Sequence, residues 1–121
     1  MHELGLLTSV VEAVERAAAE ATSKVSRVEN VALKVGTLSG AVPEALHGSW
    51  PLAKAGTICE DARLTLEVIP ATVFCPTCNR DVEIDEFFAL TCPECGTPTG
   101  NMTHGREFAL DYVEWSTEDS P

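Results

Sequence analysis

The sequence predicts an α+β fold: a small three-stranded sheet with two helices, interrupted by a zinc-ribbon-like hairpin module. Three observations support this prediction. The chain opens with an amphipathic helical pattern, three later segments alternate in hydropathy as strands do, and two C-x-x-C pairs stand between the second and third of those segments. The expected order along the chain is therefore helix, strand, helix, strand, metal-binding hairpin, strand.

The first helix is expected over residues 4–22, because apolar side chains recur there at the i, i+3, i+4, i+7 spacing of one helix face: Leu7, Val10, Val11, Val14, Ala18 and Ala21. Residues 28–36 alternate as a strand and are followed by a glycine-bounded loop. A second helix is expected from Pro43 to about residue 55, since proline suits a first helical turn. Pro51 inside it cannot donate a backbone hydrogen bond, which predicts a kink or an early break.

Residues 62–69 alternate most clearly, and residues 107–115 form the last expected strand. The alternation slips at Asp111 and Tyr112, which predicts a β-bulge. We divide the chain into one α+β domain, residues 1–70 plus 104–121, and a zinc-binding module over residues 71–103.

The composition excludes some classes of function. The 121 residues include 8 basic and 19 acidic ones, for a net charge of −11. This balance argues against nucleic-acid binding, which relies on clusters of Lys and Arg. No apolar run is long enough for a membrane span, and no signal peptide is visible, so a cytoplasmic location is expected.

The two C-x-x-C pairs, Cys75 with Cys78 and Cys92 with Cys95, predict a closed four-thiolate zinc site. Asn79 and Gly96 follow the pairs, and both residue types tolerate the left-handed backbone of a tight metal knuckle. Two disulfides, free thiols or a rubredoxin-like iron site are the alternatives. The fifth cysteine, Cys59, is expected to be a buried small apolar residue.

The chain begins with Met1, His2 and Glu3, directly before the first helix. An α-amine, a backbone amide nitrogen and an imidazole can enclose one metal ion in fused rings, and such nitrogen-rich sets suit Ni(II) or Cu(II). The alternative is that a histidine in second position has no role. His104 after the second cysteine pair and His47 are both read as exposed, and the alternating acids Asp81, Glu83 and Asp85, with Glu86 beside them, as a solvated face.

These features occur in one order: Met1-His2-Glu3, an amphipathic helix, residues 35–40 (VGTLSG), the two cysteine pairs, and residues 105–108 (GREF) before a closing strand. The series resembles the HypA/HybF family of nickel metallochaperones, which serve [NiFe]-hydrogenase maturation and in some organisms urease. The resemblance implies nickel ligands from Met1, His2 and Glu3, and zinc ligands from the four paired cysteines. It also implies transient Ni(II) cargo, structural Zn(II), and partners that include a HypB-type GTPase, the hydrogenase large subunit and, in some organisms, urease maturation proteins. A further nickel ligand, from Glu44 or His104, is left open.

The sequence contains no Ser/His/Asp order, no phosphate-binding glycine loop and no helical H-E-x-x-H pattern, so no enzyme is expected. The leading hypothesis is a nickel carrier. The alternatives are a zinc-ribbon interaction module without a nickel role and an iron protein for electron transfer.

Overall fold

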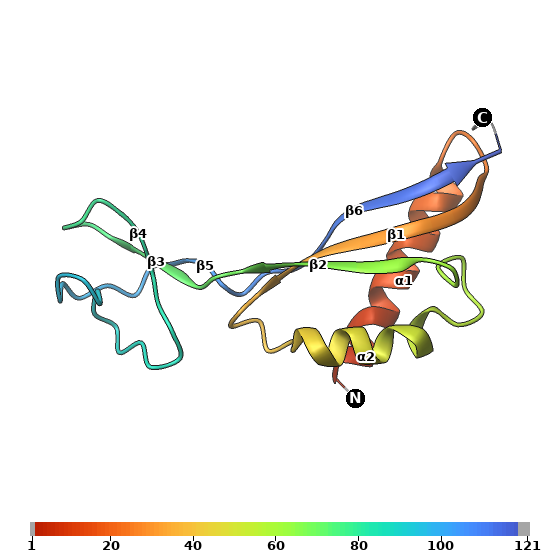
Figure 1. Cartoon of the computed structure of the whole chain (residues 1–121). Helices are drawn as coiled ribbons and strands as arrows, with labels where there is room; N and C mark the ends of the chain where they lie inside the picture. Colours follow the sequence, from red (N-terminus) through yellow and green to blue (C-terminus); the bar gives the residue numbers. More distant parts are fainter. Residues whose placement is uncertain (1, 119–121) are drawn as a thin grey trace.

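The computed structural model describes residues 2–118 and contains two three-stranded sheets joined end to end (Figure 1). The larger part holds two helices and a sheet with the strand order β2-β1-β6: α1 (His2–Glu20), β1 (Val25–Gly36), α2 (Pro43–Lys54), β2 (Arg63–Ile69) and β6 (Phe108–Thr117). The smaller part, the cysteine module, has the order β4-β3-β5: β3 (Thr72–Cys75), β4 (Arg80–Glu83) and β5 (Met102–His104). The predicted α+β class with two helices, a three-stranded sheet and an inserted cysteine module is confirmed.

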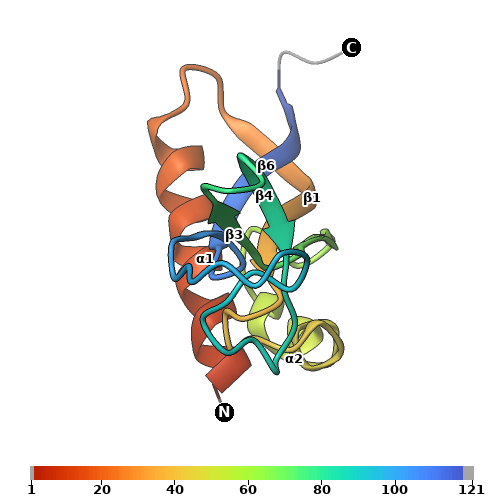
Figure 2. The ribbon, with the colours of Figure 1, turned by 90° about the vertical axis from the view of Figure 1, so that its left-hand side faces the viewer.

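The core of the larger part forms between α1, α2 and the central strand β1. The apolar face of α1 is buried as its spacing predicts, and it meets the alternating buried residues Val31, Leu33 and Val35 of β1. In the view along the strands, α1 covers one side of the sheet (Figure 2). Each buried Val or Leu contributes roughly 1.5–3 kcal/mol by leaving water, so this layer supplies most of the stability of the fold.

Helix α2 continues past Pro51 to Lys54, so of the predicted kink or early break the early break is wrong, and the kink stays a prediction. Pro51 leaves the carbonyl of His47 without its usual donor, but both residues are exposed and water can replace that donor. The helix is also held from its buried face, because the Trp50 indole N–H donates to the Ala62 carbonyl at 2.9 Å.

The sheet of the larger part is mixed. β1 pairs in parallel with β2, which requires the crossover through α2, and antiparallel with β6. In the β1–β6 pairing, Ala32 lies opposite Tyr112 while the next residue, Leu33, lies opposite Leu110. Asp111 is therefore the extra residue of a bulge, as the slip in its alternation predicts.

The two parts meet at a tightly packed junction. Gly36 N–H donates to the Glu107 carbonyl at 2.7 Å, and Leu38 N–H donates to the Gly105 carbonyl at 2.7 Å. Gly105 has φ +127, and a Cβ on it would lie 2.8 Å from Ala71. The loop after β1 thus holds both chain segments that lead to the cysteine module, and only glycine permits this approach.

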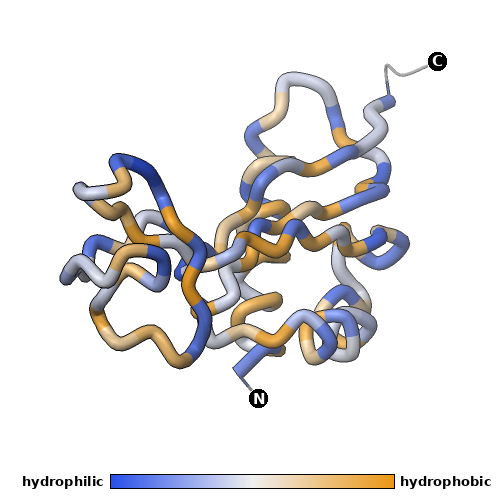
Figure 3. Tube along the Cα trace, turned by 60° about the vertical axis from the view of Figure 1, so that its left-hand side comes forward, coloured by the Kyte–Doolittle hydropathy of each residue, from blue (hydrophilic) through white to orange (hydrophobic). Residues whose placement is uncertain are grey.

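Hydrophobic segments concentrate in α1, α2 and the strands of the larger part, whereas the connecting turns are polar (Figure 3). Within residues 2–118, no helix has the length and apolar character that crossing a membrane requires.

Candidate metal centres

The four paired cysteines meet at one point of the cysteine module. Their Sγ atoms all lie within 4.8 Å of one another. Cys75 and Cys95 Sγ are 3.5 Å apart, and Cys78 and Cys92 Sγ are 4.0 Å apart. A tetrahedral ion with Zn–S bonds of about 2.3 Å has sulfur–sulfur edges of about 3.8 Å. The donor set therefore fits a tetrahedral thiophilic ion, and in residues 2–118 no other group of three or more His, Cys, Asp or Glu side chains has such a convergence.

The same local geometry presents both cysteine pairs. Asn79 N–H donates to the Cys75 carbonyl at 2.7 Å, and Gly96 N–H donates to the Cys92 carbonyl at 2.8 Å. Asn79 has φ 55 and Gly96 has φ 76, so the predicted left-handed residues are present in both turns. Both turns therefore present their two sulfurs with the same local backbone geometry.

The thiols of this cluster influence one another's protonation. Hydrogen bonding with the side chain and backbone of Thr97 lowers the pKa of the Cys95 thiol to about 6. A hydrogen bond with Cys95 in turn raises the pKa of Cys78 to about 12. Four sulfurs at this spacing ionise together only if a cation balances their charge, so the cluster is chemically suited to a divalent ion.

An ion pair between Arg80 and Glu94 links the two cysteine turns. Arg80 is the only basic residue between the cysteine pairs, and both side chains are about half exposed. Such a pair contributes little stability, but it leaves the module without a free cationic side chain between its cysteines.

The N-terminal candidate site has a different character. Met1 lies outside the described residues. His2 is exposed and Glu3 half-buried, and both belong to the first turn of α1, two residues earlier than the predicted helix start. The first four N–H groups of a helix have no partner within it. The backbone amides of His2 and Glu3 are therefore free of helical hydrogen bonds.

The Glu3 carboxylate has a partner that sequence reasoning missed. Its Oε2 accepts the Val42 N–H at 3.3 Å, just before α2 begins at Pro43. Helices α1 and α2 pack together, so this contact brings the chain start next to the loop that precedes α2. No local pattern indicates it, because the two residues are 39 positions apart.

The remaining candidates lie elsewhere. Glu44 is exposed in the first turn of α2. His104 is exposed as expected and its Nδ1 lies 2.9 Å from Glu107, outside the cysteine cluster. Hydrogen bonds from Gly105 N–H and His104 lower the pKa of Glu107 to about 2, so this carboxylate helps to hold the junction. Cys59 is fully buried, as predicted, and burial raises its pKa to about 11.

Comparison with known proteins identifies the family to which the chain belongs. The sequence model described as "Hydrogenase/urease nickel incorporation, metallochaperone, hypA" matches residues 1–115. A "Hydrogenase maturation factor HypA" of Chloroflexus aggregans is 41% identical over 94% of this chain and 98% of its own length. A protein of the same name from a Roseiflexus species is 41% identical over all of this chain and 96% of its own.

Two solved structures share the fold. The solution structure of the Ni metallochaperone HypA from Helicobacter pylori superposes with a TM-score of 0.65 at 18% identity, covering 96% of this chain and 98% of that one. A second structure, titled "Solution structure of HypA protein", gives 0.69 at 20% identity and covers 98% of each chain.

The fold and the cysteine cluster together define a small α+β metal-binding protein with an inserted four-cysteine module. The matches extend over nearly the whole chain and include both candidate centres. The chain belongs to the HypA family of metallochaperones, which are maturation factors and not enzymes.

Proposed function

We propose that this protein is a nickel metallochaperone that binds Ni(II) at its N-terminus and delivers it for maturation of [NiFe]-hydrogenase, with urease as a second client class. The observation that supports this most directly is the family match over residues 1–115, which includes Met1, His2, Glu3 and all four paired cysteines. Its partners would be a HypB-type GTPase, the hydrogenase large subunit and, where urease is a client, urease maturation proteins, in the cytoplasm.

The cysteine cluster would hold zinc as a structural ion. All four positions are thiolates, so no coordination site is left for a substrate, and the ion would stabilise a module too small for a core of its own. Cys75, Cys78, Cys92 and Cys95 would be its ligands. The sulfur–sulfur distances and the turn geometry that the two cysteine pairs share support this assignment.

Nickel would bind through the Met1 amine, the His2 amide and imidazole, and the Glu3 backbone. The free amides of the first helical turn support this arrangement, because deprotonation of an amide there breaks no hydrogen bond of the helix. The Glu3 carboxylate is engaged with Val42, which favours a backbone contribution from Glu3 over a carboxylate one. The positive end of the helix dipole opposes a cation by about 0.3–1 kcal/mol, so affinity would be moderated, as delivery requires.

Nickel titration calorimetry tests this proposal on four chains: the native chain, one with an added N-terminal glycine, His2→Ala and His47→Ala. The added glycine converts the amine to an amide and His2→Ala removes the imidazole, so both should abolish stoichiometric nickel binding. His47→Ala removes another exposed histidine, from α2, and this chain should bind nickel as the native chain does. Glu3→Gln should change affinity little, because glutamine retains an oxygen for Val42.

Unchanged nickel affinity in the extended and His2→Ala chains would refute the nickel site. The second candidate function, a zinc-ribbon protein-interaction module, would then remain. An iron-based electron carrier is tested by metal analysis, since a colourless protein with one zinc per chain excludes it.

A further inference from the structure

The outer loop of the cysteine module, residues 84–90, displays apolar side chains to solvent. Phe87 is 79% exposed and Leu90 is 65% exposed, although both are large hydrophobic residues. Burying such a side chain would stabilise the fold by roughly 1.5–3 kcal/mol, and neither Phe87 nor Leu90 contributes this stabilisation.

This loop is held in a defined shape. Ile84 N–H donates to the Ala71 carbonyl at 2.9 Å, and Thr99 N–H donates to the Leu90 carbonyl at 3.0 Å, so both ends are anchored. Phe87 N–H donates to the Asp85 carboxylate at 2.9 Å. Leu90 has φ 65, an unfavourable backbone for a leucine, and such strain concentrates at functional positions. The exposure of Phe87 and Leu90 is thus an ordered feature of the module.

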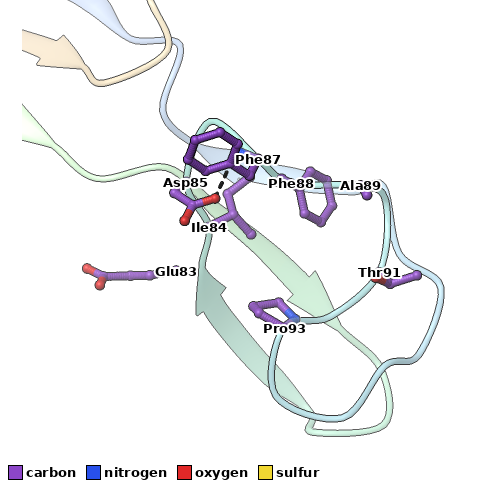
Figure 4. Close-up of a pocket in the computed structure, with 8 residues that line it drawn as sticks. All are labelled: Glu83, Ile84, Asp85, Phe87, Phe88, Ala89, Thr91 and Pro93. Atoms are coloured by element: carbon purple, nitrogen blue, oxygen red, sulfur yellow. Dashed lines mark hydrogen bonds between the residues drawn. The ribbon is translucent and has the colours of Figure 1, made fainter.

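A groove of about 410 Å³ runs along the inner side of the loop. Its apolar wall comes from Ile84, Phe88, Ala89 and Pro93, and Glu83 and Asp85 stand at its rim (Figure 4). An apolar wall beside an exposed aromatic ring can receive one apolar side chain of another molecule.

The charge around the groove is uniformly negative. Residues 81–94 include five acids and no Lys or Arg, and of these acids Glu94 alone is in an ion pair within the described part of the chain. Such a surface repels nucleic acid and anionic membranes. A second copy of this chain also carries −11 charges, which disfavours self-association. The complementary occupant is a protein segment with an apolar side chain flanked by Lys or Arg.

We propose that residues 84–90 dock such a basic and apolar segment of the protein that receives nickel, the hydrogenase large-subunit precursor. This inference rests on the proposed nickel-delivery function. A receiver held at the cysteine module would leave His2 uncovered, because α1, which begins at His2, belongs to the larger part, on the other side of the junction (Figure 1). Docking then uses the cysteine module and nickel transfer uses the N-terminus, so the bound receiver does not block any nickel ligand.

The test measures binding of the hydrogenase large-subunit precursor, taken from the same organism, to full-length chains by calorimetry. Phe87→Ser with Leu90→Ser should weaken the complex at least tenfold. Asp85→Asn with Glu86→Gln should flatten its dependence on salt concentration, and asparagine keeps an acceptor for Phe87 N–H. Leu52→Ser, at a 63% exposed leucine on α2, is the matched control and should bind as the native chain does. Zinc content verifies that each variant is folded.

Each other outcome overturns the proposal. Equal binding by the native and Phe87→Ser/Leu90→Ser chains, or no complex with the native chain, removes the docking role. If the native chain self-associates in sedimentation and the double variant does not, the surface belongs to contacts between two copies of this chain. If the double variant loses binding to a HypB-type GTPase but still binds the large-subunit precursor, the surface belongs to the GTPase. Binding of anionic phospholipid vesicles that depends on Phe87 would indicate a membrane. Nickel titration of the same chains separates these failures from failure of the nickel site.

Discussion

Replacing Gly36 with alanine tests whether the loop after β1 holds the two sheets together. A Cβ at this position would lie 2.2 Å from the carbonyl carbon and oxygen of Gly105 and 2.7 Å from the nitrogen of Arg106. All three atoms belong to the backbone, so no side-chain rotation relieves the contact. The segment that leads from the cysteine module into β6 must move away by about 1 Å to restore ordinary van der Waals distance.

That movement has a calculable cost. Gly36 N–H to the Glu107 carbonyl and Leu38 N–H to the Gly105 carbonyl are both 2.7 Å, and a shift of about 1 Å exceeds hydrogen-bond range. The Gly36 N–H and the Gly105 carbonyl belong to buried residues, and each of these two groups costs about 1–3 kcal/mol when it is left without a partner. Alanine recovers roughly 0.5 kcal/mol by restricting the unfolded chain. The net loss is therefore roughly 1.5–5.5 kcal/mol, or a melting temperature lower by about 6–22 °C for a chain of this length.

Gly48→Ala is the matched control. Gly48 lies exposed in α2, and a Cβ there would meet nothing within 4 Å. Helix propensity alone should stabilise this variant by about 1 kcal/mol and raise its melting temperature by about 4 °C. Thermal unfolding by circular dichroism gives both values, and zinc content should be native in both variants because the cysteines lie away from the junction. A Gly36→Ala chain as stable as the native one would refute the account of the junction.

Three further outcomes are expected. Cys75→Ala should lose zinc and unfold residues 71–103 while the larger sheet keeps its circular dichroism, and an ordered module without metal would contradict the structural role of zinc. Zinc chelation at pH 8 should unfold the cysteine module and expose its four thiols to iodoacetamide, while Cys59 is spared because it stays buried in the larger part, where its pKa of about 11 keeps it a neutral thiol at pH 8. A fifth early modification, detected by intact mass, would show that the burial of Cys59 is incomplete. Nickel affinity should fall as pH is lowered, because protons compete for the nitrogen ligands, and pH-independent affinity would point away from His2.

The sequence predicts the cysteine module well because its determinants are local. Each knuckle is a short turn, and the spacing of two cysteines with Asn79 or Gly96 after them specifies the backbone that brings the sulfurs together. The bulge at Asp111 is equally local, since a slip in alternation reverses which side chains face the core. The apolar face of α1 follows from periodicity alone.

Other features depend on contacts between distant segments. The approach of Gly36 to Gly105 joins residues far apart in sequence, and a glycine in a loop motif does not indicate which backbone approaches it. The parallel pairing of β1 with β2 is decided by the crossover through α2 and by the shared core. Helix α1 begins at His2 and not at residue 4, because the packing of Leu7 and the contact of Glu3 with Val42 extend it beyond the periodic region.

The two proposed metal centres differ in how firmly the surrounding fold holds their ligands. At the cysteine cluster, three of the four sulfur-bearing residues are buried or partly buried, and each turn is closed by backbone hydrogen bonds. Removal of an ion from this cluster would leave four thiols at close spacing without a balancing cation, and we expect the module to unfold. At the N-terminus, releasing an ion requires only that the first helical turn open, because the amides of His2 and Glu3 support no hydrogen bond within the helix. Opening a helix end lies at the low-cost end of local unfolding, so the first site is suited to a permanent ion and the second to a transient one.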